Sequence, residues 1–398
     1  MINNTFILKL FNAASMQRWN DKIRPCELRE LDKQAHKMII AYFLGKFDEE
    51  KEGFSWIEII EGGLFELLQR IVLTDLKPQV FNRIKEDEKK YMELKKWVFH
   101  QLKPIISSFG EGFIERFKNH FATSDNTINK RILSAAHFYA TMWEFNIIER
   151  ANPDGYEIPQ IKRHLEERQE RYYDLKGIQN LALYGRYRNF IDLCGQLRFQ
   201  LRWNHINMNP RISVLGHMLI VAIISYLLSL TINACQKRCI NNYFTGLFHD
   251  LPEVLTRDII SPVKRSIEGL EELIKEYEKE QMEKEVYTLL PPHWLKDIKM
   301  YTEDEFLSTV TVDDKTIGVT SEEISKKYNK DAFNPKDGEL IKAADELSAY
   351  TEAYLALNNG VNSPELKSAL SQIKEKYKNK VIAGIDFGII YKGFNYSD

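Results

Sequence analysis

Apolar side chains recur at intervals of three and four residues along most of this sequence, and that periodicity limits the fold more than any other feature. Such spacing places the side chains on one face of an α-helix, whereas a half-buried strand alternates with a period of two. Sustained alternation of that kind is scarce in the chain. The segments with the helical period span residues 28–47, 56–73, 91–109, 130–149, 211–232 and 338–357. We therefore predict an all-α protein built as a helical bundle.

The chain has 398 residues, more than a single domain usually holds, so two domains are expected. The clearest break is the turn-forming sequence Ala-Asn-Pro-Asp-Gly at 151–155, and a charged stretch of helical composition follows at 162–171. The polar stretch 301–336 is interpreted as an irregular insertion between core helices. We assign a first domain to residues 1–155, a helical linker to 156–190 and a second domain to 191–398.

Charge and cysteine content exclude several classes of protein. The 55 Lys and Arg residues nearly balance the 57 Asp and Glu residues, whereas a protein that binds a nucleic-acid backbone concentrates positive charge. A small basic pocket for one phosphate is compatible with this balance. The four cysteines are too few and too scattered for a disulfide framework. Cys235 and Cys239 could share a helical face, but no second pair completes a zinc site, so we expect reduced thiols.

Two features bear on the membrane. The first residues lack the basic leader and the small-residue cleavage site of a signal peptide. The most apolar stretch, residues 214–232, approaches the length of a membrane span. It includes His217 and Ser225, however, and has no basic residues at its N-terminal side, so we interpret it as a buried core helix. We expect a cytoplasmic protein with no membrane partner.

Three parts of the C-terminal half carry side chains that bind divalent metal ions. His249 and Asp250 follow an apolar run, and Glu253 lies one helical turn after His249 on the same face. His217 lies on the apolar stripe of its own helix, where a histidine is more often a hydrogen-bonded core residue than a ligand. Asp345 also lies on an apolar stripe, and a buried carboxylate is costly unless it is paired or binds a metal ion. Together these side chains would form a site with two nitrogen and two oxygen ligands.

The order of these residues is similar to that of the HD superfamily of metal-dependent phosphohydrolases, in which a histidine, a His-Asp pair and a distant aspartate follow one another. The string HDLPEVLTRDIISPVK at 249–264 resembles the 5′-deoxyribonucleotidase branch of that superfamily, whose pattern is roughly HDxxEvltGDlptPvK. Arg202-Trp203 match an Arg-Trp pair of this branch, and KAADELSAY at 342–350 matches its K-x-A-D-x-L-x-A-Y. The resemblance covers residues 191–360.

The resemblance implies a role for each matching residue. One divalent ion, which could be manganese, cobalt, magnesium, zinc or iron, would be held by His217, His249, Asp250 and Asp345. The ion polarises a phosphoryl oxygen and lowers the pKa of a bound water. Asp250 and Glu253 would act in catalysis, with Glu253 positioning that water or moving a proton. Nucleotide contacts are implied for Arg202 as a donor fork for phosphate, Trp203 as an apolar wall, Asp258 on the sugar side, and Lys264. Trp203 could instead be core packing, and Lys264 a surface residue.

Two features depart from the pattern of the branch. The first ligand histidine lies in Gly216-His217-Met218, where the branch usually has Glu before the histidine and Ser after it. Arg257 replaces the usual glycine before Asp258, and arginine adopts a positive φ less easily than glycine does. Metal binding does not depend on these positions, whereas the shape of the nucleotide pocket does, and so the identity of the substrate is open.

The N-terminal half repeats the same order of residues with the metal ligands replaced. The parallel segments are Arg18-Trp19 with Arg202-Trp203, GLFEL at 63–67 with GLFHD at 246–250, Thr74-Asp75 with the region of Asp258, and Ala135-Ala136-His137 with Ala343-Ala344-Asp345. We assign His36 to the place of His217. Glu66, His36 and His137 could still bind an ion, but the loss of the central aspartate favours a degenerate HD-like domain without an intact metal site.

Two roles are open for this half. Its Arg18-Trp19 pair could bind a nucleotide without cleaving it, or could simply pack. Members of the resembled branch form dimers, so two such halves in one chain would mimic a dimer by analogy. We therefore expect either a monomer with an internal pseudo-dimer or a homodimer.

The leading hypothesis for function is a metal-dependent 5′-nucleotidase that releases phosphate from (deoxy)nucleoside 5′-monophosphates. A second is an HD phosphohydrolase acting on another nucleotide, such as a triphosphate or a signalling nucleotide, which Arg257 and the polar insertion keep open. A third is a nucleotide-binding regulatory protein with little turnover, which the intact ligand set of the C-terminal half disfavours. Each hypothesis predicts a nucleotide partner and no nucleic-acid polymer.

Overall fold

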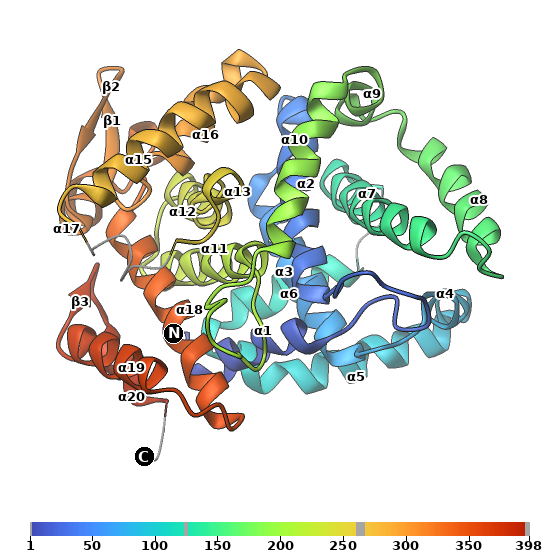
Figure 1. Cartoon of the computed structure of the whole chain (residues 1–398), viewed down its shortest axis with the longest axis horizontal. Coiled ribbons are helices and arrows are strands. Elements are labelled where there is room, and N and C mark those ends of the chain that lie inside the picture. The colour runs from blue at the N-terminus through green and yellow to red at the C-terminus, as the bar shows by residue number, and fades with distance from the viewer. Residues whose placement is uncertain (1, 123–125, 260–266, 395–398) are drawn as a thin grey trace.

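The prediction of an all-α chain is confirmed by the computed structural model, which describes residues 2–122, 126–259 and 267–394 (Figure 1). Within those ranges the strands form only two small antiparallel hairpins. The first pairs β1 (Thr309–Val312) with β2 (Lys315–Gly318), and the second pairs β3 (Val381–Ile382) with β4 (Ile385–Asp386). Every other regular element in the described residues is helical.

The N-terminal half is built around one buried helix, α2. The helices of this half are α1 (Asn4–Ser15), α2 (Glu30–Asp48), α3 (Trp56–Leu73), α4 (Pro78–Glu86), α5 (Glu88–Ile106), α6 (Glu111–Ala122) and α7 (Ile128–Ala151). Side-chain caps fix where several of them begin: the Ser55 hydroxyl, for example, accepts a hydrogen bond from the backbone N–H of Glu58 at the start of α3. α2 is buried along almost its whole length, because α1, α3 and α7 pack around it.

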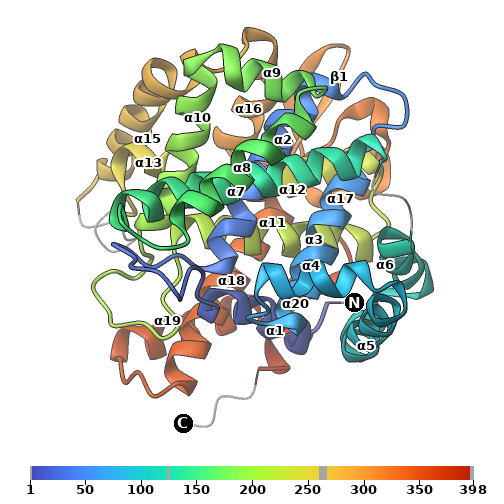
Figure 2. The same cartoon turned by 90° about the vertical axis from the view of Figure 1, so that its right-hand side faces the viewer.

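The segment predicted as a linker is helical and lies against the N-terminal half. It contains α8 (Ile158–Gln169), α9 (Lys176–Leu183) and α10 (Gly185–Gln196). α8 lies alongside α7 (Figure 2), and α9 and α10 both contact α2. The approach of α9 is close, since a Cβ atom on Gly177 would lie 2.9 Å from Cα of Leu44.

The C-terminal half is organised around α11 and α18. Its helices are α11 (Val214–Thr231), α12 (Gln236–Phe248), α13 (Glu253–Thr256), α15 (Leu270–Gln281), α16 (Leu295–Thr302), α17 (Ser321–Glu323), α18 (Gly338–Asn358), α19 (Pro364–Tyr377) and α20 (Phe387–Lys392).

Short helical segments of other types lie in all parts of the chain. The 3₁₀ segments are η1 (Ser107–Phe109), η2 (Glu170–Tyr172), η3 (Leu197–Phe199), η5 (Tyr287–Leu289), η6 (Pro292–Trp294) and η8 (Asp331–Phe333). The π segments are η4 (Met282–Val286) and η7 (Ile324–Tyr328).

The apolar stretch that approaches the length of a membrane span is α11. Among the described residues it is the one helix long and apolar enough to cross a bilayer, and 89% of it is buried inside the fold. α12 packs against it on one side, α18 and α2 on others. The interpretation of this stretch as a core helix is therefore confirmed.

The two halves share one apolar core. α2 packs against α11, and the ring of Tyr42 on α2 lies 4.7 Å from that of Phe244 and 5.1 Å from that of Phe248 on α12, centroid to centroid. Polar contacts also cross between the halves: the Ser213 hydroxyl donates to Oδ1 of Asp32 at 2.6 Å. α11 therefore stabilises both halves at once.

The polar stretch 301–336 has more regular structure than the sequence indicates. It contains the β1–β2 hairpin, α17 and two short helical segments. Buried Arg238 of α12 anchors it by donating to the Ser325 hydroxyl and by pairing with Asp337. Elements this short carry no readable periodicity, so the sequence pattern missed them.

Candidate metal centre

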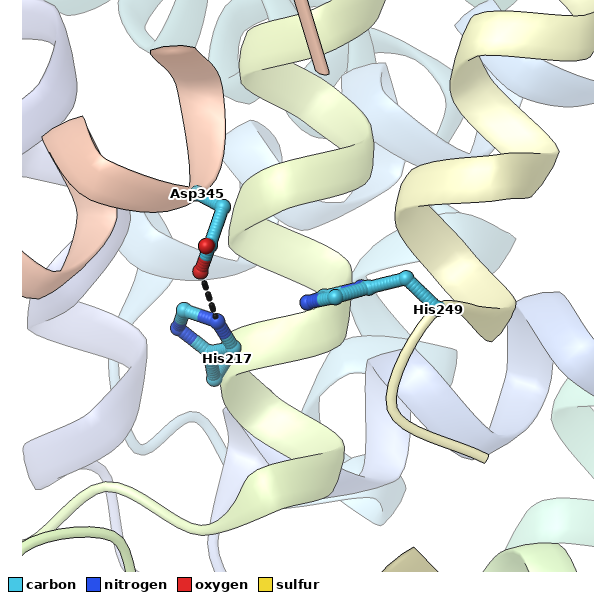
Figure 3. A group of neighbouring side chains, drawn as sticks. All are labelled: His217, His249 and Asp345. Carbon is cyan, nitrogen blue, oxygen red and sulfur yellow. Dashed lines mark hydrogen bonds and ion pairs between the residues drawn. The ribbon is translucent and has the colours of Figure 1, made fainter. Parts of the chain in front are cut away.

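The four predicted ligands come from three helices that meet at one point. His217 lies in the first turn of α11, His249 and Asp250 follow the last residue of α12, and Asp345 lies on α18. Nε2 of His217 is 3.0 Å from Oδ1 of Asp345 and 3.8 Å from Oδ2 of Asp250. Nε2 of His249 is 3.2 Å from the same Asp250 oxygen. Figure 3 shows His217, His249 and Asp345 pointing toward one another, with one donor atom from each lying within 4.8 Å of the others.

A hydrogen bond to the backbone determines which ring nitrogen of His249 faces the site. Its Nδ1 donates a hydrogen bond to the carbonyl of Gly246 at 2.9 Å, so Nε2 is the nitrogen that keeps its lone pair. Nε2 is buried and faces the site, and its 3.2 Å contact with Oδ2 of Asp250 does not have the geometry of a hydrogen bond. A buried acceptor in that state fits a metal ligand better than a structural histidine.

His217 is held in the same way by a carboxylate. Nδ1 lies 2.8 Å from Oε1 of the fully buried Glu352 and 3.1 Å from the Ser348 hydroxyl. Nε2 is thereby turned toward Asp345, which is the carboxylate–histidine arrangement common at metal sites. Without an ion, burial and Arg202 lower the pKa of His217, but Glu352 and Asp345 outweigh them and raise it to about 9.

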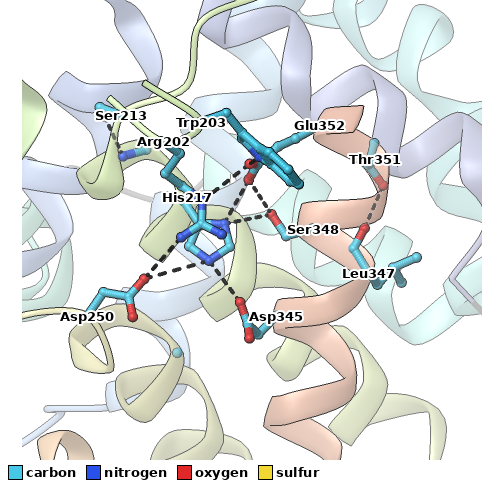
Figure 4. Close-up of polar contacts among 12 residues, drawn as sticks. Arg202, Trp203, Ser213, His217, Asp250, Asp345, Leu347, Ser348, Thr351 and Glu352 are labelled. Carbon is cyan, nitrogen blue, oxygen red and sulfur yellow. Dashed lines mark hydrogen bonds and ion pairs between the residues drawn. The ribbon is translucent and has the colours of Figure 1, made fainter. Parts of the chain in front are cut away.

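Glu352 also fixes the two residues predicted to contact substrate (Figure 4). Its Oε2 accepts hydrogen bonds from Nε1 of Trp203 at 3.0 Å and from Nε of Arg202 at 3.2 Å. Arg202 reaches in the other direction to Oδ2 of Asp250, 3.5 Å away. The sequence prediction missed Glu352. Its signal was present, because Glu352 lies seven residues after Asp345 and so on the same face of α18.

Both site carboxylates stay ionised at neutral pH. Burial raises the pKa of Asp250, but His249, His217 and Arg202 outweigh it and hold that pKa well below the usual range. Burial likewise opposes ionisation of Asp345, and Lys342 and His217 lower its pKa far more. The site therefore offers two imidazole nitrogens and two anionic oxygens, a donor set that suits a divalent ion.

Residues 194–374 match a family model described as an HD domain. The C-terminal half contains an HD domain. The match includes all four predicted ligands, and HD domains bind divalent metal ions and are generally phosphohydrolases, which supports an enzyme of that general type. No curated protein matches the chain.

The remaining predicted residues of the HD domain lie in or beside α13. Glu253 is buried and begins this helix, one turn after His249. Asp258 is half-buried, and burial together with the charge of Asp250 raises its pKa although Arg202 opposes the shift. Arg257 adopts φ 65°, so the positive φ expected of the family's glycine is kept in spite of the strain. Lys264 lies outside the described residues.

The assignment of His36 to the place of His217 is wrong. Nε2 of His36 donates to the carbonyl of Ile191 at 2.9 Å, and its Nδ1 faces Arg198. The residue that contacts His137 is Lys33, whose Nζ lies 2.5 Å from Nδ1 of that ring. Side chains three residues apart on a helix point in directions that differ by only about 60°. The apolar pattern therefore did not distinguish position 33 from position 36.

Proposed function

We propose that this protein is a metal-dependent 5′-nucleotidase that releases phosphate from (deoxy)nucleoside 5′-monophosphates. One observation carries the proposal: Nε2 of His217 and Nε2 of His249 converge with the ionised carboxylates of Asp250 and Asp345, and the guanidinium of Arg202 lies beside Asp250 at the same point. A cationic fork next to a metal-ligand set suits a phosphate monoester.

His217, His249, Asp250 and Asp345 would hold the ion. The mixed nitrogen and oxygen donor set is compatible with manganese, cobalt, magnesium, zinc or iron. A divalent ion there supplies Lewis-acid polarisation of the phosphoryl group and lowers the pKa of water.

Other side chains of the HD domain would bind the substrate and take part in proton transfer. Arg202 would bind phosphoryl oxygens through the N–H groups that point away from Glu352. Glu253 would hold a proton of the attacking water, and Asp258, whose pKa is raised, would hydrogen-bond the sugar. The indole of Trp203, fixed by Glu352, would form an apolar wall for the nucleoside.

A second candidate is an HD phosphohydrolase that acts on a triphosphate or a signalling nucleotide. Exposed Arg257 favours it, because it adds a cation next to Asp258 where the monophosphate branch has glycine. A further phosphate could pair with that guanidinium. A third, a nucleotide-binding regulatory protein with little turnover, would use the same pocket.

The deciding experiment is phosphate release from a panel of nucleoside 5′-monophosphates, triphosphates and signalling nucleotides, with added manganese or cobalt. Asp250→Asn removes one ligand charge at constant size, and Asp192→Asn, an exposed change on α10, is the matched control. Release from monophosphates that is lost only in Asp250→Asn supports the nucleotidase. No release from any monophosphate, with metal bound, overturns it, and release from the other nucleotides then favours the second candidate. Nucleotide binding without any release favours the third.

We further propose a cytoplasmic protein, which the four free thiols support. The shared core of the two halves supports a monomer with an internal pseudo-dimer rather than a homodimer. Light scattering on the purified protein distinguishes these states, since a homodimer would have twice the 46.8 kDa mass of the chain.

A further inference from the structure

The two halves share a backbone frame around their Arg-Trp pairs. Trp19 and Trp203 both have positive φ, 55° and 54°. Each pair is preceded by a residue that forms an isolated antiparallel bridge twelve positions along the chain, Gln17 with Arg29 and Leu201 with Ser213. This match fixes the register between the halves independently of any side chain.

The buried glutamate that receives the Arg-Trp pair is also repeated. Oε2 of Glu144 on α7 accepts from Nε of Arg18 at 2.8 Å and from Nε1 of Trp19 at 3.0 Å. Glu352 makes the same two contacts in the C-terminal half. Both halves therefore keep the frame that surrounds the metal centre of the HD domain.

Within that frame none of the four metal ligands is kept. Lys33 lies four residues after Arg29, as His217 lies four after Ser213, and it contacts His137. His137 precedes Glu144 by seven residues, as Asp345 precedes Glu352. The other replacements, counted from the aligned Gly-Leu-Phe strings, are Glu66 for His249, Leu67 for Asp250 and Arg70 for Glu253.

Carboxylates neutralise only part of the positive charge in this cluster, because three guanidinium groups share two glutamates. Arg18 and Arg70 both bind Glu30, and Arg18 and Arg198 bind Glu144. Lys37 binds Glu66.

Lys33 differs from these cations, because among the described residues no carboxylate binds it. It is fully buried, and its one hydrogen-bond partner among the described residues is the imidazole of His137. Burial and the charge of Arg18 hold the pKa of Lys33 well below its usual range. The protein packed around the imidazole of His137, together with the charges of Lys33 and Lys37, lowers the pKa of this ring as well, although the residue is partly open to solvent. Arg18, Arg70, Arg198 and Lys37 thus share three glutamates, so the cluster holds more cationic side chains than carboxylates.

We propose that this cluster, formed by Arg18, Lys33, Lys37, Arg70 and His137, is a second ligand site, which binds a phosphate group without a metal ion and without hydrolysis. Fully buried Lys33 contacts the ring of His137, a residue exposed to solvent, and Arg70 lies at the rim with a quarter of its side chain exposed. A dianion would give Nζ of Lys33 a charged acceptor and would favour the protonated form of this side chain. Leu67 in the place of Asp250 leaves too few donors for a divalent ion, so the bound group is not attacked.

The test is calorimetric titration of the full-length protein, freed of divalent ions on a chelating resin, with inorganic phosphate and separately with a nucleoside 5′-monophosphate. Lys33→Met removes the Nζ group at similar volume. Lys46→Met, at an ion pair on the same helix, is the matched control. Arg202→Gln is added so that residual phosphate binding in the HD domain is recognised.

We expect wild type, Lys46→Met and Arg202→Gln to bind phosphate, and Lys33→Met to bind at least about tenfold more weakly, the effect of one charge-assisted hydrogen bond. Tighter binding of the nucleotide than of phosphate would identify a nucleotide as the ligand, and equal binding would identify the phosphate group alone. No binding by the ion-free wild type, or unchanged binding by Lys33→Met, overturns the proposal. Because these titrations contain no divalent ion, they do not depend on the hydrolase proposal.

Loss of folding does not confuse the result. The side-chain contact of Lys33 is an imidazole and not a carboxylate, so Lys33→Met leaves no buried charge unpaired and should unfold near the wild-type temperature. Arg70→Gln at the exposed rim provides a second variant, and it too should weaken phosphate binding. Full phosphate affinity in Arg70→Gln would contradict the proposed site.

Discussion

Nδ1 of His217 and Oε1 of Glu352 lie 2.8 Å apart, and this contact joins α11 to α18 behind the metal centre. Glu352 thus fixes the ring that carries one ligand nitrogen, and it also positions Arg202 and Trp203. A single buried carboxylate therefore connects the ligand set with the groups proposed to bind substrate.

Glu352→Gln should weaken metal binding by about 10- to 100-fold, because the neutral amide no longer orients His217 or raises its basicity. Competition with a chromophoric chelator measures the affinity. Glu144→Gln is the matched control, since this buried residue receives the Arg-Trp pair of the N-terminal half as Glu352 receives that of the HD domain. Equal metal affinity in wild type and Glu352→Gln would show that the contact does not tune the ion.

Arg202→Lys should lower kcat/KM by about 10- to 100-fold, because an ammonium keeps the charge but cannot span Glu352 and Asp250 as the planar fork does. Steady-state phosphate release gives the ratio. Arg18→Lys makes the same change at the corresponding position, and its kcat/KM should stay near that of wild type. A similar loss in both variants would mean that the effect is one of folding.

Gly246→Ala should destabilise the protein by about 1–3 kcal/mol, because the new methyl group would lie 2.7 Å from Cα of Ala222 on α11 and would force two helices apart. At the corresponding Gly63 a methyl group meets only the flexible side chain of Met38. The gain in helix propensity, about 1 kcal/mol, should offset that contact. Urea unfolding of both alanine variants tests the difference, and equal losses would contradict it.

His36 should make the protein sensitive to mild acid. Burial, with Arg198 adding to it, lowers the pKa of His36 to about 3, whereas the unfolded chain takes up this proton near pH 6.5. The unfolded state then binds more protons, so the free energy of unfolding falls as the pH drops below 6.5, by about 2 kcal/mol at pH 5.

His36→Gln keeps a donor for Ile191 and removes the titration. The variant should therefore lose about 2 kcal/mol less than wild type between pH 7 and pH 5. Carboxylates titrate mainly below this window, so the difference isolates His36. Unfolding free energies measured at the two pH values decide the matter, and parallel curves for both proteins would contradict the prediction.

Helical periodicity was sufficient to locate the elements that build the site. The segment 211–232 corresponds to α11 and 338–357 to α18, and the four ligands predicted on and beside these helices do converge. The apolar face of a long amphipathic helix shows which side packs against other helices, and for this reason these helices could be predicted from the sequence.

Contacts between distant segments could not be predicted from the sequence. Glu352 is meaningful only because His217 and Trp203 reach it, and Lys33 was passed over for a histidine three residues later. The β1–β2 hairpin is joined to the residues before α18 by the bridge between Thr309 and Lys336, which no local pattern indicates. Each of these features arises from tertiary packing, which a single sequence does not encode in its periodicity.

Because α11 is buried between α2, α12 and α18, we expect the two halves to unfold together. Neither half can melt while the other stays native, since either loss would strip this helix of its apolar neighbours. Heating should give a single calorimetric transition. An ion bound only to the native HD domain would raise the stability of the whole chain by about 1.4 kcal/mol for each tenfold excess over its Kd, and would thus protect from proteolysis helices that it never touches.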